Sequence, residues 1–476
     1  MLFVHGRSRL RVLRGMTVMA ACYAGCAAAY AQTDAYWLNP VDGAWRTASN
    51  WSTDPEYPLG SDYHAHIDAV GSPYEVDFDA ALGIEQLTID SEDATFRMHG
   101  GSLTIYDQLN VLQGRMIVNG TGNRRGISGG TFNTGPGGVI EAVDTKFSSI
   151  TNIGTIKAID LILAGTSSNQ GIIEVDVDGI LYLEDDWANP GTIQLNGGMV
   201  DLGGDFASSD IGTINSVGGI VRFSGNVDNS AQTLSDTVIG RIQLLSGTIT
   251  GGVIDAGVYG LTTAPSPTAP GRANATLAGV QVVGEITVRT GGDLSLVDVD
   301  LTNNQTITIG DYPLDPDNDG QTGLLFPGTQ TLGGIREIIF NARPDTSSQS
   351  VWGASIRPVG GTLTLGPNVT VRNVSGGGII GDSDLPFVNQ GLISAEVAGE
   401  KIRFDGETFI TEGPIQCIAG AELSGWQVVN HGTINAMGPL TLNIFENHGD
   451  IESWDWMVVD GIWSNYGTIT AHDDLE

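Results

Sequence analysis

Apolar and polar residues alternate in short runs that recur along most of the chain. Residues 154–158 place apolar side chains at every second position, and residues 191–195 repeat the scheme before a turn at 196–198. Alternation with a period of two is typical of strands that bury one face and leave the other in water. Beyond the N-terminal segment, no window of a dozen residues carries the apolar stripe of a helix. The chain is therefore predicted to be almost entirely β.

A five-residue signature, Asn-x-Gly-x-Ile, returns along the chain. Copies begin at Asn152, Asn169, Asn189, Asn389, Asn430, Asn447 and Asn465, and variants that begin at Asp210 and Thr411 keep the Gly and the Ile. Within each block, neighbouring copies are 17 to 22 residues apart. That spacing is too short for a helical repeat of about 34 residues and suits one coil of a β-helix. We predict a single-stranded parallel β-helix, or β-solenoid, of about 22 coils.

The Gly and Asn of the signature are expected at the corners of the coils. Both residues tolerate the positive φ that tight bends require. Asn at equivalent corners would stack into a ladder whose amides bond neighbouring coils, and the alternative is that Asn only forms turns. The recurring Ile, Val and Leu are expected to point inward, because one coil buries its apolar face only when the next coil stacks on it.

The N-terminus is predicted to be an export signal. Arg7, Arg9, Arg11 and Arg14 precede an apolar stretch, and Ala29-Tyr30-Ala31 offers a cleavage pattern before Gln32. The stretch is too short for a transmembrane helix, so the mature chain is expected to lack a membrane span and to be extracellular or at the cell surface. A lipoprotein site at Cys26 is the alternative. Cleavage after Ala31 removes two of the three cysteines and leaves Cys417 as the one cysteine of the mature chain.

The composition divides the chain into five expected segments. Residues 1–31 are the signal peptide, 32–90 the cap and entry strands, and 91–259 regular coils. Residues 260–345 form an irregular β-helix with loop insertions, among them a Pro-rich stretch at Pro265, Pro267 and Pro270. Coils resume over 346–476, where the sequence ends soon after a signature. A barrel, sorting helix or dockerin is not recognisable there, so truncation is one expectation.

The charge excludes some partners. The net charge is −34, and loss of the four arginines would make it −34 − 4 = −38. Phosphates would be repelled, so nucleic acid and anionic lipid are not expected partners. Weak sites for divalent cations are compatible with this charge.

The segment after the signal carries a resemblance to a known group. Tyr36-Trp37-Leu38 and Gly43-Ala44-Trp45, followed by Ser49-Asn50-Trp51-Ser52, resemble the opening of exported bacterial β-helix proteins related to autotransporter passengers. The short sequence segments 328–334, 360–367 and 387–395 are similar to segments that recur in large surface proteins of planctomycetes and related bacteria. The resemblance implies a surface scaffold, and it implies no assigned activity. In physical terms the tryptophans form a cap over the first coil or, alternatively, an exposed sugar-stacking platform.

Two groups of residues are candidate metal sites. Asp315, Asp317 and Asp319 alternate before Gly320, which is the pattern of a calcium loop, but position twelve is Phe326 instead of Glu. A partial Ca²⁺ loop and a solvated acidic turn both remain open. Asp62, His64, His66 and Asp68 also alternate, which would place them on one strand face for a transition metal. Polar decoration of an outer face is the simpler explanation there.

Catalysis is not expected. Acidic pairs occur at Asp176/Asp178, Glu184/Asp185/Asp186 and Asp298/Asp300, but none lies beside a basic cluster, and no hydrolase elbow, phosphate loop or zinc-protease motif is present. His431 and His448 both hold the second signature position and are expected to stack as turn decoration. We predict an exported structural or adhesive surface β-helix whose partners are glycans or cell-surface components. A carbohydrate-binding or carbohydrate-active β-helix is the alternative.

Overall fold

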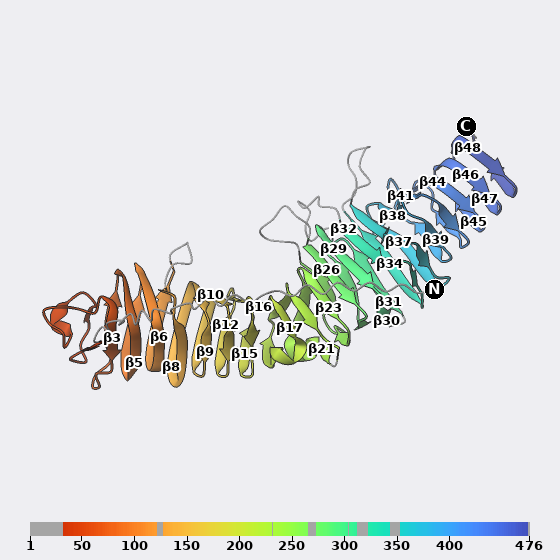
Figure 1. Cartoon of the computed structure of the whole chain (residues 1–476). Helices are drawn as coiled ribbons and strands as arrows, with labels where there is room; N and C mark the ends of the chain where they lie inside the picture. The colour runs from red at the N-terminus through yellow and green to blue at the C-terminus, as the bar shows by residue number, and fades with distance from the viewer. Residues whose placement is uncertain are drawn as a thin grey trace, which may run out of the picture.

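The fold is a β-solenoid of about 18 turns, with 65% of residues in strands and 3% in helices. The structure is a computed structural model that describes residues 32–120, 127–230, 232–264, 273–302, 304–311, 322–342 and 353–474. Figure 1 shows the coils following one another from the N-terminal to the C-terminal end, with a change of direction near the middle of the rod. The predicted all-β β-helix is therefore confirmed.

The number of turns is lower than the predicted 22 because the central coils are longer than the signature spacing. Ile307 pairs with Ile338, 31 positions later, and Ile338 pairs with Val371, 33 positions later. The N-terminal copies of the signature that begin at Asn152 and Asn169 are only 17 positions apart. The additional residues of the central coils lie between the paired strands, so they lengthen a coil without adding a layer.

The N-terminal coils use long strands that bend at bulges. Their elements are β1 (Thr33–Tyr36), β2 (Gly43–Ala44), η1 (Ala48–Asn50), β3 (Gly60–Ile67), β4 (Tyr74–Phe78), β5 (Ala81–Met98), β6 (Ser102–Asn119), β7 (Ile127–Ser128), β8 (Thr131–Ser148), β9 (Ile150–Asn152), β10 (Thr155–Ala164), β11 (Ser167–Asn169), β12 (Ile172–Asp176), β13 (Ile180–Leu183), β14 (Trp187–Ala188), β15 (Thr192–Asn196) and β16 (Met199–Leu202).

The middle of the rod contains the one α-helix of the described residues. Its elements are β17 (Asp205–Ala207), η2 (Ser208–Ile211), β18 (Thr213–Val217), β19 (Ile220–Phe223), β20 (Asn226–Asp228), β21 (Thr233–Ser235), α1 (Asp236–Ile239), β22 (Arg241–Leu244), β23 (Gly247–Thr250), β24 (Val253–Asp255), β25 (Leu261–Thr263), β26 (Ala273–Ala278), β27 (Gln281–Val283), β28 (Ile286–Val288), β29 (Gly292–Val297), β30 (Asp300–Leu301), β31 (Gln305–Ile309), β32 (Thr322–Pro327), β33 (Gln330–Leu332) and β34 (Arg336–Asn341).

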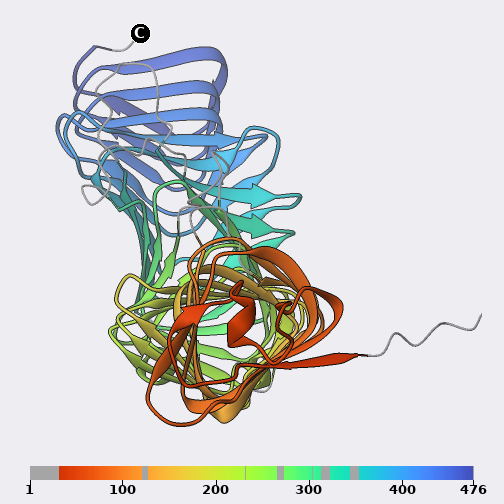
Figure 2. The ribbon, with the colours of Figure 1, turned by 90° about the vertical axis from the view of Figure 1, so that its left-hand side faces the viewer.

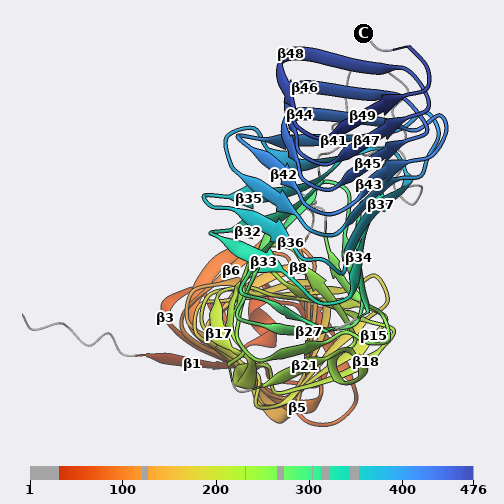
Figure 3. The same ribbon diagram turned by 90° about the vertical axis from the view of Figure 1, so that its right-hand side faces the viewer.

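The C-terminal coils regain the short spacing. They consist of β35 (Ala354–Val359), β36 (Leu363–Leu365), β37 (Val369–Ser375), β38 (Gly378–Asp382), β39 (Phe387–Asn389), β40 (Leu392–Ala395), β41 (Lys401–Gly406), β42 (Phe409–Thr411), β43 (Ile415–Cys417), β44 (Glu422–Asn430), β45 (Thr433–Ala436), β46 (Leu440–Asn447), β47 (Asp450–Ser453), β48 (Met457–Asn465) and β49 (Thr468–Ala471). Viewed from this end, β44, β46 and β48 lie one above another on one side of the coil (Figure 3).

The strands form three sheets of 29, 16 and 4 strands. The pairings between described strands are parallel, and each brings a residue opposite its counterpart in the next coil. The signature isoleucines make one such row from Ile156 through Ile173 and Ile193 to Ile214. These four side chains are buried, as predicted for residues that point into the stack.

The signature asparagines form ladders inside the rod. Asn152 Nδ2 donates to Asn169 Oδ1 at 2.6 Å, and Asn169 Nδ2 donates to Asn189 Oδ1 at 2.5 Å. A second ladder joins Asn430 to Asn447 at 2.8 Å and Asn447 to Asn465 at 2.7 Å. All but the last of these asparagines are buried. Since a buried amide without a partner is costly, the ladder is confirmed as the main role of these side chains.

Most of the signature glycines have a different role from the one predicted. Gly154, Gly171 and Gly191 have negative φ, so the left-handed conformation is not the reason for glycine there. A Cβ on Gly171 would lie 2.1 Å from the carbonyl oxygen of Gly154, one coil earlier. The glycines are needed because stacked backbones approach each other closely. Positive φ occurs at Gly212, in the variant signature that begins at Asp210, and at bends outside the signature such as those at Asp144 and Asp160.

Three tryptophans close the N-terminal end of the rod. Trp37, Trp45 and Trp51 are at most 2% exposed, and Trp51 contacts both Trp37 and Trp45 edge to face. The Trp45 ring also packs edge to face on Phe78 and Phe96 of the first coils. Figure 2, seen from this end, shows the entry segment in red lying across the mouth of the coil. The predicted aromatic cap is confirmed, and burial of the rings rules them out as a sugar platform.

Candidate ligand-binding surface on the C-terminal coils

The exposed tryptophans of the described residues all lie between 426 and 463. Trp426, Trp454, Trp456 and Trp463 are 44%, 50%, 43% and 51% exposed. The other four described tryptophans are buried. Large exposed aromatic groups on a soluble surface mark interaction sites more often than scattered aliphatic residues do. The C-terminal coils are therefore where a ligand is most expected.

The surface around Trp426 is built by the register of three strands. Trp426 of β44 lies opposite Asn443 of β46, which lies opposite Asp460 of β48. At the next position each coil bends, and Gln427 and Ile444 have φ of 53° and 50°. The bend interrupts the alternation of buried and exposed side chains in each of these strands. Next to it, Ile444 of β46 is 38% exposed and Ile462 of β48 is 83% exposed.

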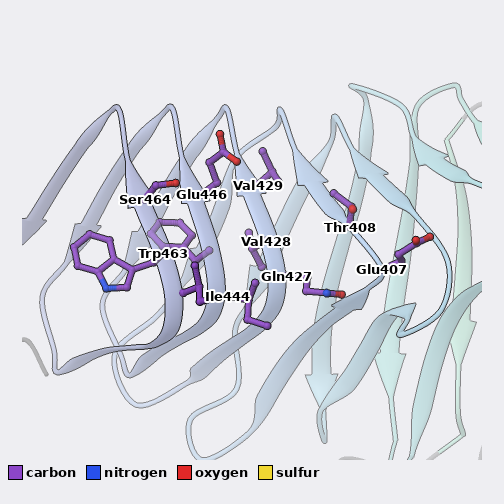
Figure 4. A pocket seen from close by; sticks show the side chains of 11 residues that line it. Glu407, Thr408, Gln427, Val428, Val429, Ile444, Glu446, Trp463 and Ser464 are labelled. Carbon is purple, nitrogen blue, oxygen red and sulfur yellow. The ribbon is translucent and has the colours of Figure 1, made fainter.

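A pocket of about 280 Å³ lies on this bend. Apolar side chains, among them Ile444, Ile462 and Trp463, share the lining with Glu407, Glu446 and the Gln427 amide (Figure 4). Trp463 of β48 is the register partner of the buried residue Phe445 of β46. The Trp463 indole is half exposed, and β48 is paired only with β46 among the described strands. The pocket therefore combines apolar surface with carboxylate acceptors, which is typical of a site that orients a ligand with a few polar groups.

The charge of this region is of one sign. From residue 404 to the end of the sequence there are 12 Asp and Glu residues and no Lys or Arg. Arg403 is the last basic residue, and it is engaged by Asp405 through an Nη2 to Oδ2 contact of 2.8 Å. Burial raises the pKa of the Asp405 carboxyl and the neighbouring Asp382 adds to the effect, although Arg403 opposes it. The field at the surface favours cations and repels anions.

Stacked rings follow the outer corners of the same coils. His431 stacks on His448 at a centroid distance of 4.8 Å, and His448 stacks on Tyr466 at 5.0 Å. Trp454 stacks on His472 at 3.7 Å. The predicted stacking of His431 on His448 is confirmed. Each of these rings has one face covered by its neighbour, whereas Trp426 and Trp463 are not among the stacked pairs of the described residues.

Of the four residues predicted to share a strand face, His64 and His66 do so, whereas Asp68 lies just beyond the end of β3. His64 and His66 of β3 lie on its outer side, since Ala65 and Ile67 are buried. Both imidazoles contact Asp34 of β1, at 3.6 and 3.1 Å, and Tyr36 stacks on His66. Within the described residues, no group of three or more His, Cys, Asp or Glu side chains is arranged to hold a metal ion.

The remaining candidates are the acidic loop, the acidic pairs and Cys417. Asp315, Asp317 and Asp319 lie outside the described residues, so the structure does not test the calcium loop. Among the acidic pairs, Asp176 accepts a hydrogen bond from Asn196 and Glu184 pairs with Lys146 at 2.9 Å. These carboxylates therefore take part in surface contacts between coils. Cys417 is buried, and burial raises the pKa of its thiol.

Sequence reasoning considered tryptophan only in the entry segment and missed the C-terminal surface. The signal was present in the alternation, because Leu423 and Gly425 precede Trp426 at buried positions and predict that Trp426 points outward. The bend at Gln427 has no such signal, since Gln rarely adopts positive φ.

The described residues contain no helix with the length and apolar character needed to cross a bilayer. Comparison with protein-family models, with curated proteins and with solved structures found no match to this chain.

Proposed function

We propose that this chain is an exported structural or adhesive surface rod without catalytic activity. Its sequence resembles those of autotransporter passengers and planctomycete surface proteins. The observation that carries the proposal is the stack itself. Its interior polar groups serve contacts between coils, such as the Asn152 to Asn189 ladder, and the exposed tryptophans of the described residues lie on its C-terminal coils. Such a rod gives reach and presents a surface at a distance from its base.

Export is part of the proposal and rests on the N-terminal sequence. Arg7 to Arg14, the apolar stretch and the Ala29-Tyr30-Ala31 pattern favour cleavage after Ala31. N-terminal sequencing of the protein recovered from the outside of expressing cells should begin at Gln32. Recovery of the uncleaved chain in the cytoplasm would contradict export.

Binding assays separate the three classes of function. The purified rod, residues 32–476, is titrated against cells and immobilised glycans. Saturable binding supports adhesion, and a rod that binds neither is a purely structural element. The carbohydrate-active alternative predicts new reducing or unsaturated ends from a polysaccharide panel, which a non-catalytic rod does not produce.

The acidic loop can be tested in the same preparation. Calorimetric titration of Ca²⁺ into the rod and into an Asp317→Ala variant distinguishes a calcium loop from a solvated acidic turn. A calcium loop gives saturable heat that the substitution removes. Equal heats in both proteins assign Asp315, Asp317 and Asp319 to the turn.

A further inference from the structure

The C-terminal coils present apolar surface that the described coils do not cover. We define the C-terminal aromatic surface as Trp426, Ile444, Asp460, Ile462 and Trp463 together with Glu446, spread over strands β44, β46 and β48. Trp426 is about half exposed on β44, which has described strands on both sides. Trp463 and Ile462 are exposed on β48, which is paired only with β46 among the described strands. Covering such rings with a ligand releases the water on them, which favours binding.

The charge around this surface restricts what can cover it. Glu446 and Asp460 are part of it, Glu407 lines the adjoining pocket, and no Lys or Arg occurs after Arg403. A carboxylate accepts hydrogen bonds and attracts cations, and an indole face attracts a cation as well. An anionic polysaccharide would meet repulsion from both the local charge and the net charge of −34.

We propose that the C-terminal aromatic surface binds a glycan built of amino sugars with free amines. The inference rests on the proposed adhesive function and names its ligand class. The apolar face of a sugar ring stacks on Trp426 or Trp463, and the ammonium group is attracted to Asp460 and to Glu446, whose Oε1 also contacts His448 Nε2 at 2.6 Å. One ligand class thereby uses both the rings and the carboxylates.

The register makes the surface suited to a chain of sugars. Trp426 and Asp460 occupy the same row on coils two layers apart, which separates their backbones by about 9–10 Å. A ligand that bridges them spans more than one sugar ring. An oligosaccharide should therefore bind more tightly than its monosaccharide.

The test compares three oligosaccharides with the same β-1,4 linkage, in which the second carbon carries an ammonium, an N-acetyl or a hydroxyl group. Calorimetry on the rod of residues 32–476 is done at low salt and at mildly acidic pH, where amines are protonated and most carboxylates are ionised. The free-amine oligosaccharide should bind at least about fivefold more tightly than the other two, and added salt should weaken it. Equal affinity for all three, or binding of none, overturns the proposal.

Variants place the binding on the surface. Trp426→Ala should weaken the free-amine ligand roughly two- to fivefold, the size of an exposed cation–π contact. Asp460→Asn keeps the oxygen that accepts the Gly461 N–H and should weaken binding while reducing its salt dependence. Tyr106→Ala and Glu92→Gln are controls, because both residues are exposed on N-terminal coils. Loss of binding in the controls equal to that in the variants overturns the assignment of the site.

The outcomes also distinguish the inference from the proposed function. A rod that binds cells saturably but ignores the free-amine glycan refutes this ligand and leaves adhesion in place. A rod that binds no surface at all refutes adhesion. Tight binding of polylysine without binding of the glycan shows that the surface takes basic polypeptides, which contradicts the proposal. Far-UV circular dichroism of each variant checks that the coils are intact.

Discussion

Asn152 donates from its side-chain amide to the side-chain oxygen of Asn169, one coil further on, at 2.6 Å. The Asn169 side-chain amide in turn donates to the side-chain oxygen of Asn189. Each internal member is therefore a donor and an acceptor at once. The ladder links layers through side chains in addition to the backbone pairing.

Replacing Asn169 with Ala should destabilise the rod. The substitution leaves Asn152 Nδ2 and Asn189 Oδ1 without this partner in a buried place, and the free energy of unfolding should fall by about 2–3 kcal/mol. Asn196→Ala is the control, because Asn196 is exposed at the end of β15 and its side-chain amide bonds to the Asp176 and Gln194 side chains at the surface, so its loss should cost at most about 0.5 kcal/mol. Urea denaturation measures both. Equal effects would contradict a structural ladder.

Replacing Gly171 with Ala should also be destabilising, for steric reasons. The new Cβ would lie 2.1 Å from Gly154 O, so two layers must separate locally, at a cost of about 1–3 kcal/mol. A Cβ added to Gly333 would meet no heavy atom within 4 Å, and the φ of Gly333 is not positive. Gly333→Ala should therefore leave the thermal midpoint almost unchanged, and a similar loss at both sites would refute the close-approach explanation.

Removing the centre of the cap should expose the first coil. Trp45 is fully buried against Trp51, Phe78 and Phe96, and Trp45→Ala should cost about 3–5 kcal/mol. Uncovered strand edges promote association, so light scattering should show larger species. Trp426→Ala removes the same side chain from an exposed position and should change neither stability nor association. A monomeric, fully stable Trp45→Ala protein would contradict the capping role.

Asp311 should make stability depend on acidity. Burial raises the pKa of its carboxyl, but hydrogen bonds from Thr290 and Arg289 outweigh burial and hold the pKa below its ordinary value. A depressed folded-state pKa adds stability above the unfolded-state pKa of about 3.9, and this stability is lost as pH falls through the folded value. Asp311→Asn should therefore be less stable than the parent protein at pH 7, and the difference should shrink in acid. A difference independent of pH would contradict this account.

Cys417 should be unreactive in the native rod. Its thiol is buried, and burial raises its pKa, which lowers the thiolate fraction. A thiol reagent should label the folded protein of residues 32–476 slowly and the protein in denaturant rapidly. Rapid labelling of the folded rod would show that the Cys417 coil opens.

The alternation and the signature predict the coil stack well because both follow directly from packing. Ile173 must point inward, and the amide of Asn169 must find a partner once it is buried. The role of the glycines is harder to predict from the sequence. A recurring glycine position fits a left-handed bend and fits equally the close approach of two stacked backbones that is seen at Gly171. The bend at Ile444 is hidden for a further reason, since a β-branched residue with φ of 50° is held there by its neighbours in the stack against its own preference.

The row of Ile173 and Ile193 has a consequence for how such a molecule changes in length. These residues are register partners, and each layer contacts chiefly its neighbours. A duplicated segment from 173 to 192 would meet the same surfaces above and below that the original segment meets. Whole turns can therefore be gained by tandem duplication without a new interface between layers. The C-terminal aromatic surface would then lie farther from the N-terminal cap.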